Sequence, residues 1–200
     1  MAKNGKIGKG AGMAYSLFEA VIEIFEAFNR RDIKELRKIS NKCTNSLVLA
    51  EERGMLGLSV ISYALAKMLE KPRYGKSDKW DEFASNTQKK LRECSVYAKE
   101  GKTSEFKACV EELEKGMQET EDRDKRYVRD LLYKARIKIA STLYAQGFSL
   151  GSAAELTGAS ERDIASYAGK TMIFDRAGRT KSIGERLEGV RKLFRKKASE

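Results

Sequence analysis

Apolar residues recur every three to four positions along most of the first 145 residues, which is the spacing of a helix with one buried face. The first two such stretches open at Ser16 and at Asp32, each followed three residues later by glutamate, as in a capping box. We expect Gly54 to end the second helix. The apolar positions of these two helices are Leu17, Val21, Phe25 and Phe28, then Ile33, Leu36, Ile39, Cys43 and Leu47.

Four further helices are predicted from the same pattern. The third ends before Pro72, because proline disfavours helical backbone in the residue that precedes it. Residues 71–77, KPRYGKS, form the clearest linker. The expected helices run from Leu56 to Lys71, over 78–99, from Thr103 past Met117, and from about Val128 to Gly147.

When the sequence is shifted along itself by about 71 residues, part of this apolar pattern aligns with itself. The helical part is therefore either a duplicated three-helix unit of the helical-repeat type or a chance overlap of two helical patterns. The offset places Ala27 on Ala98, Ile39 on Val110, Ala64 on Ala135 and Met68 on Ile139.

The stretch SLGSAAELTGASERDIASYAGK, residues 149–170, fits two short helices joined by a tight turn. Gly158 stands where a left-handed backbone makes that turn. Ala154 is small where the second helix crosses the first, and Ile164 belongs to the core between them. Ser160 can cap the second helix, with an acidic residue three positions later. This spacing predicts a helix-turn-helix, whose second helix enters the DNA major groove.

From Lys138 to Phe194 the chain resembles predicted helix-turn-helix transcription regulators of archaea. The resemblance rests on an AELxGxS turn, a Tyr-x-Gly-Lys-Thr exit and a terminal helix, here SIGERLEGVRKLF. It implies a helix-turn-helix fold and a DNA-binding function, without a target sequence. Thr157 departs from the usually apolar residue before the turn. The matching residues are Ala154-Glu155-Leu156, Gly158, Ser160, Tyr167, Gly169-Lys170-Thr171 and 182–194.

Two segments follow the helix-turn-helix. Residues 170–181, KTMIFDRAGRTK, fit either a short strand or hairpin, as in a wing, or an ordered loop. Residues 182–197 predict a short basic amphipathic helix with an apolar stripe. We therefore predict an all-α protein in three parts. They are a basic flexible tail over 1–12, a helical domain over 13–135, and a helix-turn-helix domain over 136–200.

Composition narrows the function further. The 40 Lys and Arg residues against 29 Asp and Glu give a net charge of +11, which favours polyanionic partners. The chain has no histidine, the commonest general base and metal ligand, so we expect no enzyme, no cofactor and no metal. Cys43, Cys94 and Cys109 lack CxxC spacing, and we expect reduced thiols in a cytoplasmic protein. No apolar run has membrane-spanning length, so no membrane partner is expected.

Two sets of residues are predicted to contact DNA. On the second helix and its exit they are Ser160, Arg162, Ser166 and Lys170, of which Arg162 alone can make a bidentate contact to guanine. For the phosphate backbone they are Arg191, Arg195, Lys196 and Lys197. Against this, Glu155, Glu161 and Asp163 give residues 149–169 a net negative charge.

The resulting hypothesis is a sequence-specific DNA-binding transcription regulator that acts as a homodimer. The first alternative is a helical adaptor that binds protein partners through its N-terminal helices. The second is a protein that binds structured RNA through the same basic surfaces.

Overall fold

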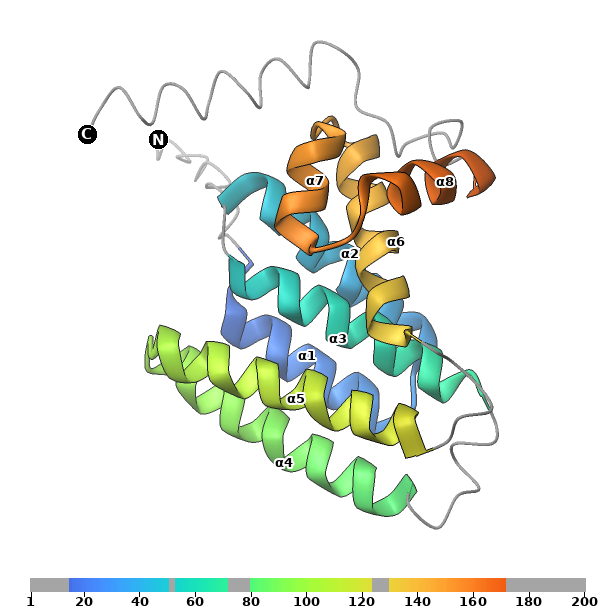
Figure 1. Ribbon diagram of the computed structural model, residues 1–200. Coiled ribbons are helices and arrows are strands. Elements are labelled where there is room, and N and C mark those ends of the chain that lie inside the picture. Colours follow the sequence, from blue (N-terminus) through green and yellow to red (C-terminus); the bar gives the residue numbers. More distant parts are fainter. Residues whose placement is uncertain (1–14, 51–52, 72–79, 124–129, 172–200) are drawn as a thin grey trace, which may run out of the picture.

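The computed structural model describes residues 15–50, 53–71, 80–123 and 130–171, and within them the chain forms eight helices and no strand (Figure 1). The predicted all-α class is confirmed for this part of the chain. The basic tail, residues 72–77 of the linker, the 172–181 segment and the terminal basic helix lie outside it. The helices are α1 (Leu17–Asn29), α2 (Ile33–Ala50), α3 (Arg53–Leu69), α4 (Trp80–Lys99), α5 (Thr103–Arg123), α6 (Leu131–Ala145), α7 (Leu150–Thr157) and α8 (Glu161–Thr171).

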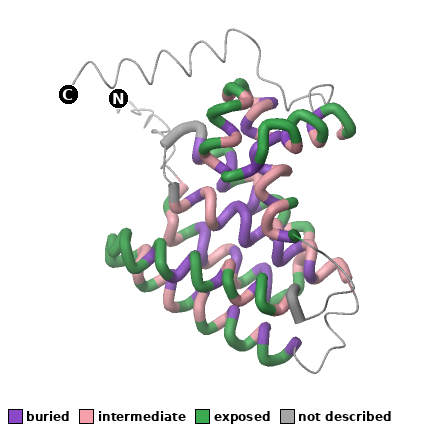
Figure 2. Tube along the Cα trace, in the orientation of Figure 1, coloured by how far each residue is buried: buried purple, intermediate pink, exposed green. Residues whose placement is uncertain are grey.

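The first five helices, α1 to α5, pack together and are called the helical body here. The α6 helix packs against this helical body. The α1 helix packs against α2, α3 and α4, and α4 pairs with α5 (Figure 1). The α6 helix lies against α2, α3 and α5, while α7 and α8 pack on α6 and on each other. Buried positions form a continuous core from α1 to α8 (Figure 2). The expected domain boundary at 135/136 falls inside α6.

Buried hydroxyl groups hold α2 against α3, the most extensive helix pair. Ser40 Oγ donates to the Ser59 carbonyl at 2.9 Å, and Ser59 Oγ donates to the Ser40 carbonyl at 2.8 Å. Ser62 Oγ donates to the carbonyl of Leu36 at 2.6 Å. Each buried hydroxyl group therefore replaces its hydrogen bonds to water with a hydrogen bond inside the protein. The small side chains also allow the two helices to approach closely.

The prediction that Gly54 ends the second helix is wrong. The α2 helix ends at Ala50, and Gly54 lies in the first turn of α3. A Cβ atom at Gly54 would come within 2.9 Å of Leu17 Cδ2 and 3.1 Å of Phe106 Cε1. The glycine thus leaves room for side chains of α1 and α5.

The α1–α2 and α4–α5 connections are the same turn, 70 residues apart rather than 71. In both, two successive N–H groups after the helix donate to carbonyls near its end, at 2.8–3.4 Å. The left-handed residue is Arg31 in the first turn, with φ 53°, and Gly101 in the second, with φ 69°. The same offset relates the buried positions Leu36, Ile39, Ser40, Cys43 and Leu47 to Phe106, Cys109, Val110, Leu113 and Met117.

These two turns provide a matched test of backbone strain. Left-handed backbone costs a non-glycine residue about 1–2 kcal/mol. Arg31→Gly should therefore raise the free energy of unfolding by about 0.5–1 kcal/mol, after the added entropy of the unfolded chain. Gly101→Ala should lower it by about 1 kcal/mol. Urea unfolding measures both, and changes of the same sign would contradict this account.

Cys94 and Cys109 form a disulfide that joins α4 to α5, with a Cα–Cα distance of 5.7 Å. The expectation of three reduced thiols is therefore wrong for this pair, because the helical hairpin brings together positions that sequence spacing leaves apart. Cys43 is free and buried. Burial raises the pKa of its thiol to about 12, so it is protonated and unreactive at neutral pH.

The disulfide should contribute measurably to stability. Its cysteines are 15 residues apart, and a loop of that length corresponds to about 3 kcal/mol of chain entropy. Reduction should lower the free energy of urea unfolding by about that amount. Alkylation of the unfolded, unreduced protein should modify Cys43 alone. Mass spectrometry that finds all three cysteines modified would show that the bridge does not form.

Candidate nucleic-acid interface

The turn between α7 and α8 has the predicted geometry. Gly158 ends α7 with φ 70°, and its N–H donates to the Ala154 carbonyl at 2.8 Å. Ser160 Oγ accepts from the Asp163 N–H at 3.1 Å, so the predicted cap of α8 is confirmed. Ile164 is fully buried, as expected.

Two details of the α7 helix differ from expectation. Ala154 is only half-buried, whereas Ala153 is fully buried, so Ala153 is the small residue inside the core. Thr157 occupies a buried position, and its hydroxyl donates to the Ala153 carbonyl at 2.7 Å. The departure from an apolar residue therefore leaves no unsatisfied hydroxyl group there.

Tyr133 of α6 fixes the start of α8 and was missed by sequence reasoning. Its hydroxyl accepts from the Ser160 N–H at 3.2 Å and donates to Asp163 Oδ2 at 2.7 Å. The hydrogen bonds from Tyr133 and Ser160 hold the pKa of Asp163 below its usual value. Further along, Ser141 Oγ donates to the Ile164 carbonyl at 3.3 Å. No spacing in the sequence indicates these contacts, because the partners lie on different helices.

The outward face of α8 brings together three of the four predicted residues. Arg162, Ser166 and Lys170 are exposed at four-residue intervals and share one side of the helix. Ala165 and Gly169 are exposed beside them, so only small side chains lie between the two cations. Ser160 is also exposed, but its hydroxyl is engaged in the cap and bonds Asp163 Oδ2 at 2.8 Å.

The acidic residues near this face are distributed unevenly. The carboxylate of Asp163 is held by Tyr133, on the side of α8 that packs on α6. Glu161 is exposed in the first turn of α8, where it complements the helix dipole, and Glu155 is exposed on α7. Asp163 therefore contributes less to the outward face than the sequence suggested.

Two cations of α6 contact the helical body. Arg136 Nη2 donates to Glu114 Oε2 of α5 at 2.6 Å. Lys138 Nζ donates to Asn41 Oδ1 at 2.7 Å and lies 5.2 Å from the centre of the Tyr63 ring. These contacts hold α6 against α2, α3 and α5. The predicted backbone residues Arg191, Arg195, Lys196 and Lys197 lie outside the described residues.

Within the described ranges, no three or more Cys, Asp or Glu side chains gather as a metal site would require. No helix in the same ranges is both long and apolar enough to cross a bilayer. Comparison of the chain with known protein families, characterised proteins and solved structures found no match.

The role of Tyr133 can be tested by pH titration. Tyr133→Phe removes the first hydrogen bond to Asp163, so the pKa of Asp163 should rise toward that of a free carboxyl group. In the native chain the lowered pKa stabilises the fold at neutral pH, and this contribution is lost as pH falls through the folded pKa. Carbon-13 NMR of the Asp163 carboxyl group measures the shift.

Tyr144→Phe is the matched control, because it removes a hydroxyl group from the same helix. It should leave the Asp163 pKa unchanged, since neither side-chain hydrogen bond of Asp163 involves Tyr144. A Tyr133→Phe titration that coincides with that of the native protein would rule out the anchoring role.

Proposed function

We propose that this protein binds DNA through α8, as a helix-turn-helix transcription regulator. The exposed face of α8 is the observation that carries the proposal: two cations eight residues apart, with only small side chains between them. A helix of this kind can lie close to base edges while its charged ends reach guanine and phosphate. Gly169 supports this use. A Cβ there would meet no atom of the described chain within 4 Å, so no contact within that part of the protein requires glycine at this position.

The arrangement of α6, α7 and α8 also supports a helix-turn-helix. The left-handed Gly158 turn leads directly into the cap of α8, and α8 packs on both preceding helices. Arg162 lies in the first turn of α8, and the N-terminal residues of a recognition helix are those that contact bases. We assign Arg162 to base contact and Lys170 to phosphate.

Binding of the DNA phosphate backbone requires more positive charge than α8 carries. Because Arg136 and Lys138 are engaged within the protein, we assign this role to Arg191, Arg195, Lys196 and Lys197. A homodimer that places two α8 helices in successive major grooves would supply the remaining affinity.

The helical-adaptor alternative receives less support. Val96 is the one large hydrophobic side chain that is exposed among the described residues, at 49% of its surface. Binding of protein partners through the body would therefore have to use polar surface there. The second alternative, binding of structured RNA, is distinguished most directly by comparing the affinity for DNA with the affinity for structured RNA.

The proposal predicts different effects for the two cations. Arg162→Ala should weaken binding to the preferred site by about 1–3 kcal/mol and relax the preference at one base position. Lys170→Ala should weaken binding to all sequences alike and reduce the salt slope by about one. Retention of genomic DNA fragments followed by sequencing, then salt titration on the enriched site, measures both.

Lys89→Ala on α4 removes the same charge from an exposed position distant from α8, and should change neither quantity. Enrichment of no motif by the native protein would contradict sequence-specific binding. An unchanged motif and affinity in Arg162→Ala would contradict the base contact, and tighter retention of structured RNA would favour that alternative.

A further inference from the structure

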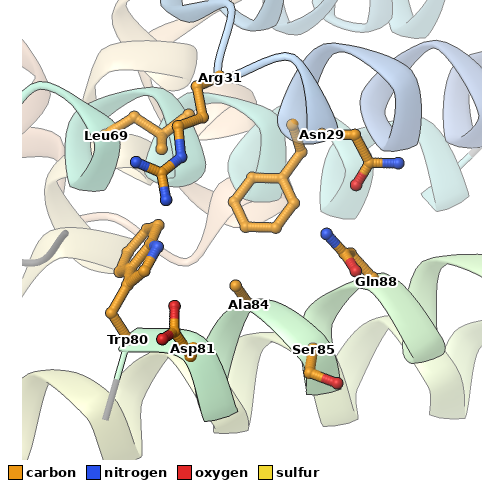
Figure 3. Close-up of a pocket in the computed structure, with 9 residues that line it drawn as sticks. Asn29, Arg31, Leu69, Trp80, Asp81, Ala84, Ser85 and Gln88 are labelled. Atoms are coloured by element: carbon orange, nitrogen blue, oxygen red, sulfur yellow. The ribbon is translucent and has the colours of Figure 1, made fainter. Parts of the chain in front are cut away.

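A cavity of about 310 Å³ opens where α1 and α3 end and α4 begins (Figure 3). Its volume is at the lower end of the range for small-molecule sites, about 300–1,000 Å³. Trp80 forms one wall and is 4% exposed, with its ring 6.3 Å from that of Phe28. The cavity lies in the helical body and is separate from α8.

The guanidinium group of Arg31 faces this cavity from a strained backbone position. It lies 6.0 Å from the centre of the Trp80 ring, with Arg31 in left-handed conformation. The equivalent turn after α4 has Gly101, which adopts this conformation without strain. Since the same turn forms with glycine, the backbone does not require arginine. Residues in strained backbone conformations cluster at binding and catalytic sites.

Groups of opposite charge line the cavity without pairing. Arg31 and Asp81 both face it and are exposed to solvent, and no ion pair joins them within the described residues (Figure 3). The side-chain amides of Asn29 and Gln88 lie at the other end of the cavity (Figure 3). A neutral apolar molecule in the cavity would displace water from both charged groups and offer no hydrogen bond in return. A molecule with one anionic and one cationic group satisfies them together.

We propose that this cavity binds a small zwitterion of the α-amino acid class. The carboxylate of the ligand binds the Arg31 guanidinium group, and its ammonium group binds Asp81. The ligand side chain extends toward Asn29 and Gln88, whose amides can donate and accept hydrogen bonds. Trp80 and Phe28 form the apolar wall. The proposal does not depend on DNA binding.

Trp80 is the only tryptophan of the chain, so its fluorescence reports on this cavity alone. Each of the twenty common L-amino acids is titrated to about 10 mM, a range that detects millimolar dissociation constants. At least one should give a saturable change in emission. Its analogue without the carboxyl group and its analogue without the amino group should each bind at least about tenfold more weakly.

Arg31→Gln should weaken binding at least about tenfold, and Arg31→Gly should do the same in a fold of at least native thermal stability. Asp81→Asn should abolish the preference for the ligand over its analogue without the amino group. Arg30→Gln is the matched control, because Arg30 is the adjacent arginine, pairs with Glu26 and does not line the cavity. It should bind like the native protein.

Three results would overturn the proposal. The first is the absence of a saturable change with all twenty amino acids. The second is equal weakening by Arg30→Gln and Arg31→Gln, which would indicate a general charge effect. The third is native affinity in Arg31→Gly, which would show that the guanidinium group makes no contact with the ligand.

Discussion

The packing of α6 against both parts of the chain is the constraint on which the rest of the structure depends. Leu131, Ala135 and Ile139 are buried in the core that α6 shares with α2, α3 and α5. On the other side of α6, Ala153 and Ile164 extend the same core into α7 and α8. The position of α8 relative to the helical body is therefore set chiefly by α6.

This constraint explains how the charged residues of the chain are divided. On α6, Arg136 and Lys138 bind Glu114 and Asn41, and so hold the helix to the body. On α8 the cations are exposed, and the carboxylate of Asp163 is directed to a tyrosine of α6. The fold thus places two cations of α6 against the helical body and leaves the cations of α8 exposed to solvent.

Local patterns in the sequence were sufficient for the helices and for the α7–α8 turn. Periodicity places the apolar stripes, and the caps at Ser16 and Ser160 form as their spacing indicates. The glycine at 158 adopts the left-handed backbone that the turn requires. Each of these features depends on residues within one or two helical turns of one another, which is why sequence spacing detects them.

Features that depend on packing between helices were missed or mistaken. The Cys94–Cys109 bridge, the Tyr133–Asp163 contact and the cavity beside Arg31 each join different helices. The hydroxyl-lined α2–α3 interface was also not predicted, because serine and threonine are not read as core residues in a hydrophobic pattern. Gly54 shows the same limit, since its close neighbours come from α1 and α5.

Native-state hydrogen exchange of the α6 amides tests the shared-helix account most directly. If α6 belongs to one core with α2 and α3, the amides of Ile139 and Leu143 should exchange with the same free energy as those of Leu36 and Ile61. Their dependence on denaturant should also coincide. Exchange of α6, α7 and α8 through a separate opening of lower free energy, with α1 to α5 still protected, would contradict the account.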